Sequence, residues 1–249
     1  MSTHSKIPWT ETTLNPWTGC TPVSSGCKYC YAKAHAHRFW GTRNFDQLVF
    51  YPERLAEPYR WRKPRLCLVC SMSDPFHPTA HIQGWTQQLL DMVTDPKLFC
   101  HTFQVLTKRP ETAFRILRVP NASPLPSNVW LGATVESARW QCRIGTLSMI
   151  PAFVRFISFE PLLGPMTNID FTGISWAIIG AESINGRPGR PCENHWIRSI
   201  MGQAREQNVA VFVKQLHHST QCKLIKDPQQ MAEILGTSVD KIQQWPVKA

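Results

Sequence analysis

Short apolar runs alternate along the chain with longer stretches that have helical spacing. Six of the apolar runs are nearly continuous, which is typical of strands buried on both faces of a parallel sheet. These runs span residues 66–70, 102–106, 129–133, 154–158, 176–179 and 209–213. A further run at 9–13 brings the expected number of strands to about seven.

Helical patterns fill the intervals between the apolar runs. Residues 83–94 place Leu89, Leu90 and Val93 on one stripe, and 111–117, 137–148 and 193–207 occupy the equivalent places later on. The alternation predicts an α/β fold, a (β/α) barrel of about six to eight parallel strands that resembles a TIM barrel and is complete or slightly open. A doubly wound sheet is the alternative, but no glycine-rich dinucleotide fingerprint follows the first strand.

The chain divides into a barrel over residues 1–225 and a helical appendage over 226–249. Asp227 and Pro228 have the sequence of a helix start, and Gly236 is expected to end that helix after about Leu235. A second short helix is expected over 238–245.

Charged or polar residues follow six successive strands. In a βα barrel these positions converge on one face, where active sites are built. Opposite charges crowded into one mouth indicate a site for something small that is zwitterionic or phosphorylated, although any one of them could instead form a salt bridge across the mouth. The strand-end residues are Ser71, Ser73, Asp74, Lys108, Arg109, Glu136, Glu160, Glu182, Lys214 and Gln215.

Three of the nine cysteines form one closely spaced group: Cys20, Cys27 and Cys30. Proline, serine and glycine between them predict a loop that curls so that the three thiolates point inward. In a cytoplasmic protein such a group indicates metal rather than disulfide. Three thiolates can hold a 4Fe-4S cluster and leave one iron open to a substrate or cofactor.

Zinc is the competing metal, and His35 or His37 would then be its fourth ligand. Residues 31–39 are expected to form a helix after the loop, which puts both histidines on a helix surface and favours the cluster. Cys67 and Cys70 form another close pair, but within a predicted strand they would point to opposite faces. We therefore expect them to be core residues.

The net charge is +10, from 27 basic and 17 acidic side chains. Such a balance attracts polyanions and makes nucleic acid a possible partner, unless the excess charge is spread over solvated faces. No apolar stretch approaches the ~20 residues of a membrane span, and the N-terminus lacks the apolar core of a secretory signal. A soluble, cytoplasmic protein without membrane contact is expected.

An aromatic residue, Tyr29, directly precedes the third cysteine of the loop. This arrangement resembles the radical S-adenosylmethionine superfamily, whose motif places an aromatic residue before the last cluster cysteine. The resemblance implies that Tyr29 packs beside the adenine of the cofactor. The first two cysteines are separated by six residues, a longer gap than in the usual motif of that superfamily.

Residues 7–215 also resemble a three-cysteine-motif family of unknown function that occurs in phages and bacteria. The matching stretches are 9–10, 15–16, 19–20, 71–74, 103–110, 128–132, 160–165 and 214–215.

The superfamily resemblance implies a mechanism. The open iron would chelate the amino and carboxylate groups of S-adenosylmethionine, and an electron from flavodoxin or ferredoxin would release methionine and a 5′-deoxyadenosyl radical. That radical would abstract hydrogen from an unknown substrate, either nucleic acid or protein. Two other functions stay open: a zinc-stabilised nucleic-acid-binding protein, and an iron–sulfur electron-transfer or sensor protein without catalysis.

The same resemblance gives the strand-end residues roles. Ser71, Ser73 and Asp74 would bind the methionyl amine. Lys108 or Arg109 would bind the carboxylate, and Glu136 the ribose hydroxyls. The residues expected to face the substrate are Glu160, Glu182, Lys214 and Gln215.

Overall fold

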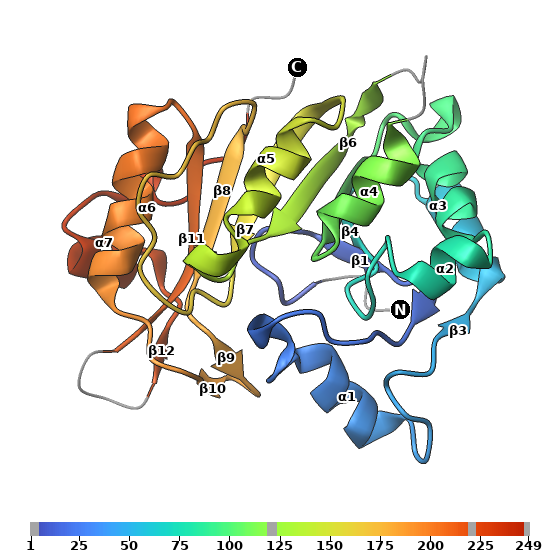
Figure 1. The fold of residues 1–249 in the computed structure, drawn as a ribbon, viewed down its shortest axis with the longest axis horizontal. Coiled ribbons are helices and arrows are strands. Elements are labelled where there is room, and N and C mark those ends of the chain that lie inside the picture. The colour runs from blue at the N-terminus through green and yellow to red at the C-terminus, as the bar shows by residue number, and fades with distance from the viewer. Residues whose placement is uncertain (1–4, 119–123, 219–222, 247–249) are drawn as a thin grey trace.

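A computed structural model describes residues 5–118, 124–218 and 223–246 and shows an α/β fold built on one eight-stranded sheet (Figure 1). The first seven strands in the sheet are parallel and the last is antiparallel. In sheet order they are β1 (Thr12–Leu14), β4 (Leu66–Val69), β5 (Thr102–Thr107), β6 (Leu125–Thr134), β7 (Ala152–Phe159), β8 (Trp176–Gly180), β11 (Ala210–His217) and β12 (Leu224–Ile225).

The strand order follows the chain from one edge of the sheet to the other. A doubly wound sheet reverses direction at a switch point, so that alternative is wrong. The six later predicted strands are confirmed with small shifts of their ends, and only the first begins late, at Thr12 instead of Trp9. In the described part of the chain, β1 and β12 are the two sheet edges, so a closed TIM-like barrel is not confirmed.

Helices cover the outer face of the sheet and bury its larger core. Side chains such as Val69, Val105, Leu131 and Ile179 point outward into this layer. The predicted helices are confirmed, with a short additional helix before α3 and a 3-10 turn before α5. The covering helices are α2 (Pro78–Ile82), α3 (Trp85–Val93), α4 (Pro110–Leu117), α5 (Cys142–Ser148) and α6 (Asn194–Glu206).

A second core of aromatic side chains fills the inner face of the sheet and shows that the sheet is curved. Trp9 lies just before β1, and its ring centroid is 6.3 Å from that of Trp176 on β8. In a flat sheet these two strands would lie about 24 Å apart, five strand spacings of about 4.8 Å. The sheet therefore curls, and Trp9 closes its concave side together with Trp130, Phe156 and Phe212.

The C-terminal segment packs against β11. In α7 (Pro228–Leu235) the Asp227 carboxylate accepts the Gln230 N–H at 2.8 Å, as expected of a helix cap. The helix predicted over 238–245 is wrong. Val239–Lys241 forms a 3-10 turn, and the chain after it extends along β11. Pro246 disfavours helix at the residue before it. Whether this segment is a separate unit stays a prediction.

No helix in the described ranges is long and apolar enough to cross a bilayer.

The packing of the inner core requires glycine at position 132 of β6, which can be tested. A Cβ there would overlap the buried ring of Phe156, and overpacking a core costs about 1–3 kcal/mol. We expect Gly132→Ala to lower the free energy of unfolding by that amount in urea titrations. Gly145→Ala in α5, where a Cβ would meet nothing within 4 Å, is the control and is expected to be neutral or slightly stabilising. Equal effects of the two substitutions would contradict the packing assigned to the concave face.

Candidate functional site

The cysteine loop crosses the carboxyl ends of the sheet strands (Figure 1). It follows β2 (Trp17–Thr18), contains a 3-10 turn over Ser25–Cys27 and leads into α1 (Tyr31–Phe39), the helix expected after it. Cys20, Cys27 and Cys30 all line one cavity of about 390 Å³, which is within the ~300–1,000 Å³ range of small-molecule sites. The cavity is completed by Thr21, Pro22, Lys33, Asn44, Phe45 and Asp46.

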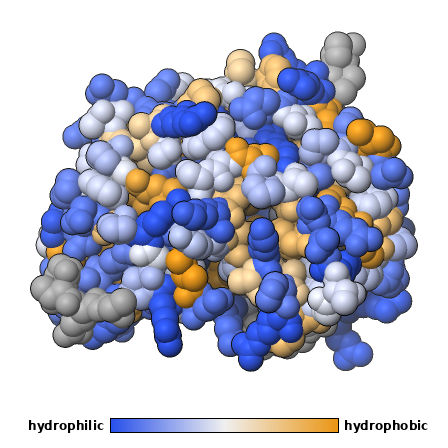
Figure 2. Space-filling model, turned by 60° about the horizontal axis from the view of Figure 1, so that its bottom comes forward, coloured by the Kyte–Doolittle hydropathy of each residue, from blue (hydrophilic) through white to orange (hydrophobic). Residues whose placement is uncertain are grey.

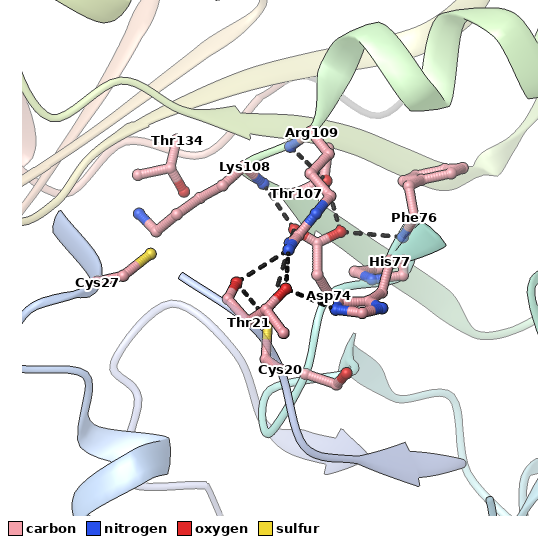
Figure 3. A network of polar contacts seen from close by, with 12 residues as sticks. Cys20, Thr21, Cys27, Asp74, Phe76, His77, Thr107, Lys108, Arg109 and Thr134 are labelled. Atoms are coloured by element: carbon pink, nitrogen blue, oxygen red, sulfur yellow. Dashed lines mark hydrogen bonds and ion pairs between the residues drawn. The ribbon is translucent and has the colours of Figure 1, made fainter. Parts of the chain in front are cut away.

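Asp74 organises the wall of this cavity from the end of β4 (Figure 3). The carboxylate is 4% exposed and accepts four hydrogen bonds. Oδ1 accepts from the Phe76 N–H at 2.9 Å and the Thr107 hydroxyl at 2.7 Å. Oδ2 accepts from the Lys108 N–H at 3.0 Å and from Arg109 Nη1 at 3.2 Å. A carboxylate with four partners has used its usual acceptor capacity.

Arg109 connects Asp74 to the cysteine loop. Nη2 donates to the Thr21 carbonyl at 2.9 Å and the Thr21 hydroxyl at 3.0 Å, while Nη1 lies 3.7 Å from Cys20 Sγ. Burial raises the pKa of the Cys20 thiol to about 12, and Asp74 adds to that rise while Arg109 opposes it. Cys20 is therefore a thiol at neutral pH unless a metal displaces its proton.

His77 supports the same loop from the N-terminus of α2. Its Nδ1 accepts the Thr79 N–H at 3.2 Å, so the ring proton is assigned to Nε2, which donates to the Thr21 hydroxyl at 2.9 Å. Burial and the charge of Arg109 lower the pKa of His77 to about 4, against the opposing effect of Asp74. The Thr21 oxygen accepts from both His77 and Arg109, which leaves its own proton free to donate.

Ser71 and Ser73 hold the segments before and after β2, respectively, to the end of β4. Ser73 Oγ donates to the Gly19 carbonyl at 2.5 Å, and Ser71 Oγ donates to Asn15 Oδ1 at 3.2 Å. Gly19 has a φ of 101° and a Cβ there would lie 2.6 Å from the Gln47 carbonyl oxygen, so the turn requires glycine. In this arrangement both serines and Asp74 hold these segments, and their binding of a methionyl amine stays a prediction.

Glu136 holds the other side of the loop from the end of β6. This fully buried carboxylate lies 3.0 Å from Arg143 Nη1 and accepts the Gly26 N–H at 3.4 Å. A Cβ on Gly26 would come within 3.0 Å of the Glu136 side chain, so the loop packs directly on it. The Lys108 ammonium is 4.0 Å from Glu136 and extends toward the side of Cys27 (Figure 3). Contact of Glu136 with a ribose stays a prediction.

The four residues expected to face a substrate fall into two groups. Glu160 and Lys214 form an ion pair across the concave mouth, with both side chains partly exposed above Gly180. Glu182 is buried, and although burial acts to raise its pKa, hydrogen bonds from Arg190 hold that pKa below its usual value. Gln215 is buried and donates to the Ala181 carbonyl at 2.7 Å.

Tyr29 lies outside the residues that line the cysteine cavity. Its ring is 39% exposed, with the Lys28 ammonium 5.2 Å and the Arg190 guanidinium 5.3 Å from the centroid. Arg190 follows the small hairpin of β9 (Ser183–Ile184) and β10 (Arg187–Pro188), so Tyr29 joins the loop to the opposite rim of the mouth. Its packing beside an adenine stays a prediction.

The other candidate metal ligands lie elsewhere. His35 and His37 occupy exposed positions of α1, as expected, and neither lines the cavity. Cys67 and Cys70 are core residues, as predicted, but both belong to the outer core because Cys70 lies past the strand end with a φ of 56°. Within the described residues no group of three or more His, Cys, Asp or Glu side chains meets the geometry of a site for a single metal ion.

Three residues of the site were missed by sequence reasoning: Thr21, His77 and Arg143. Thr21 and His77 each lie within a few residues of a predicted site residue, Cys20 or Asp74. Arg143 is seven residues after Glu136, near the start of α5, and only its burial at 1% exposure identifies it as the partner of that carboxylate.

The Arg109 links generate a prediction. Arg109→Gln removes the cation from buried Asp74, and an unpaired buried charge costs about 3–5 kcal/mol. We expect unfolding at lower urea concentration and faster amide hydrogen exchange in residues 19–27. Adding Asp74→Asn is expected to restore part of the stability but not the slow exchange of the loop. The exposed Arg62→Gln is the control, and exchange in 19–27 that is the same in Arg109→Gln and Arg62→Gln would rule out the anchoring role of Arg109.

The lowered pKa of His77 predicts that the stability of the fold depends on pH. Because its pKa is about 4 in the folded chain and about 6.5 when unfolded, the unfolded state binds the extra proton between these values. Stability that is complete above pH ~6.5 is therefore lost as the pH falls toward ~4. We expect His77→Gln to show a shallower decline of unfolding free energy over this range than the unmodified chain. Exposed His195→Gln is the control; a His77→Gln slope as steep as that of the control would show that His77 titrates normally.

Comparison with known proteins places the chain in a family. Neither the search of curated proteins nor that of solved structures gave a match. A family model matches residues 4–242 and carries the description "Protein of unknown function (DUF5131)". That description mentions neither radical S-adenosylmethionine chemistry nor a three-cysteine motif. The resemblances to the radical S-adenosylmethionine superfamily and to a three-cysteine-motif family therefore stay predictions. The match spans nearly the whole sequence, and the chain belongs to the DUF5131 family.

Proposed function

We propose that this chain is a radical S-adenosylmethionine enzyme that holds a 4Fe-4S cluster through Cys20, Cys27 and Cys30. One observation carries the proposal: these three thiols, separated in sequence, line a single cavity of about 390 Å³ at the carboxyl ends of a curved parallel sheet. We also regard the sheet as an open barrel, because its single direction of winding and its filled concave side are those of a barrel without the closing strand pair.

The residues around the cavity fit an iron–sulfur cluster. Three sulfur donors suit a cluster, and among the described residues that line the cavity no imidazole completes a four-ligand zinc site with His35 or His37. The ionisable side chains there besides the cysteines are Lys33 and Asp46. Thiolates concentrate negative charge, which the guanidinium of Arg109 at 3.7 Å from Cys20 and the ammonium of Lys33 in the cavity wall would offset. The nearest buried carboxylate, Asp74, is already neutralised by Arg109.

When bound, the cluster supplies one electron from a flavodoxin or ferredoxin to the sulfonium of S-adenosylmethionine, which gives methionine and, after hydrogen abstraction from the substrate, 5′-deoxyadenosine. The chain's own residues position the groups. Arg109 has its donors committed to Asp74 and Thr21, so of the two cations at this strand end Lys108, partly exposed, is the one available to bind the methionyl carboxylate. The free proton of Thr21 can donate to an acceptor in the cavity.

Partial exposure of the ion pair between Glu160 and Lys214 supports a role for both residues in substrate contact. Their ion pair is accessible at the concave mouth, whereas Glu182 and Gln215 are internal and position the β8–β11 end of the sheet. Glu182 orients Arg190, which in turn lies against the ring of Tyr29. We therefore assign substrate contact to the first pair and positioning to the second.

The cysteine assignment is tested by single substitutions after anaerobic reconstitution with iron and sulfide. We expect the unmodified chain to take up about four irons, to give an EPR signal of the reduced cluster that shifts on adding S-adenosylmethionine, and to form 5′-deoxyadenosine with dithionite. Cys20→Ala, Cys27→Ala and Cys30→Ala are each expected to lose the signal. Cys100→Ala and Cys142→Ala, at exposed positions away from the cavity, are controls that should retain it.

Three other results would each contradict the proposal. A cluster whose signal does not respond to S-adenosylmethionine would leave an electron-transfer or sensor protein. Stoichiometric zinc in place of iron would leave a metal-stabilised binding protein. Loss of the signal in the Cys100 and Cys142 controls would show that the three cysteines are not the specific ligands.

A further inference from the structure

The outer side of α1 and the loop before it form a cationic surface without acidic side chains. Residues 20–45 contain no Asp or Glu, and the next residue, Asp46, is a carboxylate that lines the cysteine cavity together with Lys33. The α1 surface, as used below, comprises the exposed residues Lys28, Lys33, His37, Arg38 and Phe39. A chain of net charge +10 that gathers cations beside a reactive cavity attracts a polyanion to that place.

Exposed rings lie among these cations. Phe39 is 61% exposed, with the Arg38 guanidinium 5.1 Å and the His35 ring 4.6 Å from its centroid. Tyr29 presents a second partly exposed ring between Lys28 and Arg190. Aromatic rings beside cations form stacking platforms for unpaired bases, while the cations follow the phosphate backbone. Exposed rings also occur at protein interfaces, so the competition experiment below separates nucleic acid from an acidic protein partner.

The α1 surface borders the cysteine cavity. Lys33 belongs to both, because it lies on α1 and lines the cavity with the three cysteines. Figure 2 shows the face that carries α1, where hydrophilic side chains surround a recessed and more hydrophobic centre. A strand bound along α1 would therefore pass the rim of the site.

We propose that the α1 surface binds single-stranded nucleic acid and presents one unpaired base to the cysteine cavity. The chemistry at that base rests on the proposed function, whereas the binding does not. A single strand is inferred because a duplex keeps its bases stacked inside, where an exposed ring such as Phe39 does not stack on them.

The test measures binding of a fluorescein-labelled single-stranded DNA of about 20 nucleotides, longer than one typical ~4–16-nucleotide site, by anisotropy at several salt concentrations. Phe39→Ala is expected to weaken binding about tenfold, within the effect of losing one stacked base. Arg38→Glu is expected to weaken it as well and to flatten the salt slope by about 0.7, one phosphate contact. Matched controls on other faces are Phe153→Ala, at 58% exposure, and exposed Arg115→Glu of α4; both should bind as the unmodified chain does.

Competition defines the class of ligand. Unlabelled single-stranded DNA is expected to displace the probe better than an equal-length duplex or polyglutamate of equal charge. Equal competition by polyglutamate would overturn the proposal in favour of an acidic protein, and equal competition by duplex would overturn the single-strand assignment. Equal loss of affinity in the control variants would reduce the effect to overall charge and overturn it too.

Iron content and 5′-deoxyadenosine formed without nucleic acid are measured on the same reconstituted samples. We expect both to be unchanged in all four variants, none of which alters a cavity-lining residue. Base-dependent binding without 5′-deoxyadenosine would support the docking surface and reject the enzyme. If 5′-deoxyadenosine forms but Phe39→Ala and Arg38→Glu bind DNA as the unmodified chain does, the enzyme would be supported and the docking surface rejected.

Discussion

The buried ion pair of Asp74 and Arg109 is the interaction on which the candidate site depends. Two charges taken out of water are costly, and the pair is tolerated only when their remaining hydrogen-bonding groups are satisfied. Here the β5 end supplies the Thr107 hydroxyl and the Lys108 amide to Asp74, and Thr21 supplies its carbonyl and hydroxyl to Arg109. Satisfying the pair therefore fixes the cysteine loop on the sheet, and the position of Cys20 follows from it.

A second buried carboxylate repeats this solution on the other side of the loop. Glu136 is neutralised by Arg143 and accepts the Gly26 N–H, so the loop is held between the ends of β4 and β6. Both anchors lie at the carboxyl ends of strands because the concave side below is filled by aromatic rings. Aromatic packing closes one end of the curved sheet and leaves polar groups at the other, which is where a loop with few apolar residues can bind.

The sequence predicts the elements better than it predicts the pairing of charges. Apolar runs identify the six later parallel strands of the main sheet because a strand buried on both faces has few alternatives. The two-residue antiparallel strand β12 has no such run and is not predicted, and the first strand is misplaced because Trp9 belongs to the inner core. The three cysteines are found from spacing alone. Whether a strand-end charge faces a ligand or a partner is decided by contacts between distant residues, such as Arg109 with Thr21, which are 88 positions apart. No local pattern encodes such a pair.

The distribution of paired and unpaired charge gives the mouth its chemical character. The carboxylates Asp74, Glu136 and Glu182 each have a cation partner from a neighbouring segment, so burial consumes most of the negative charge at the strand ends. Lys33 lies outside these buried pairs, at the cavity wall, and the cations of α1 add to it outside. Asp46 is the one carboxylate among the described residues that line the cavity, so the opening together with the α1 surface carries more cations than carboxylates. This excess of positive charge would suit both the proposed cluster in the cavity and the proposed nucleic acid along its rim.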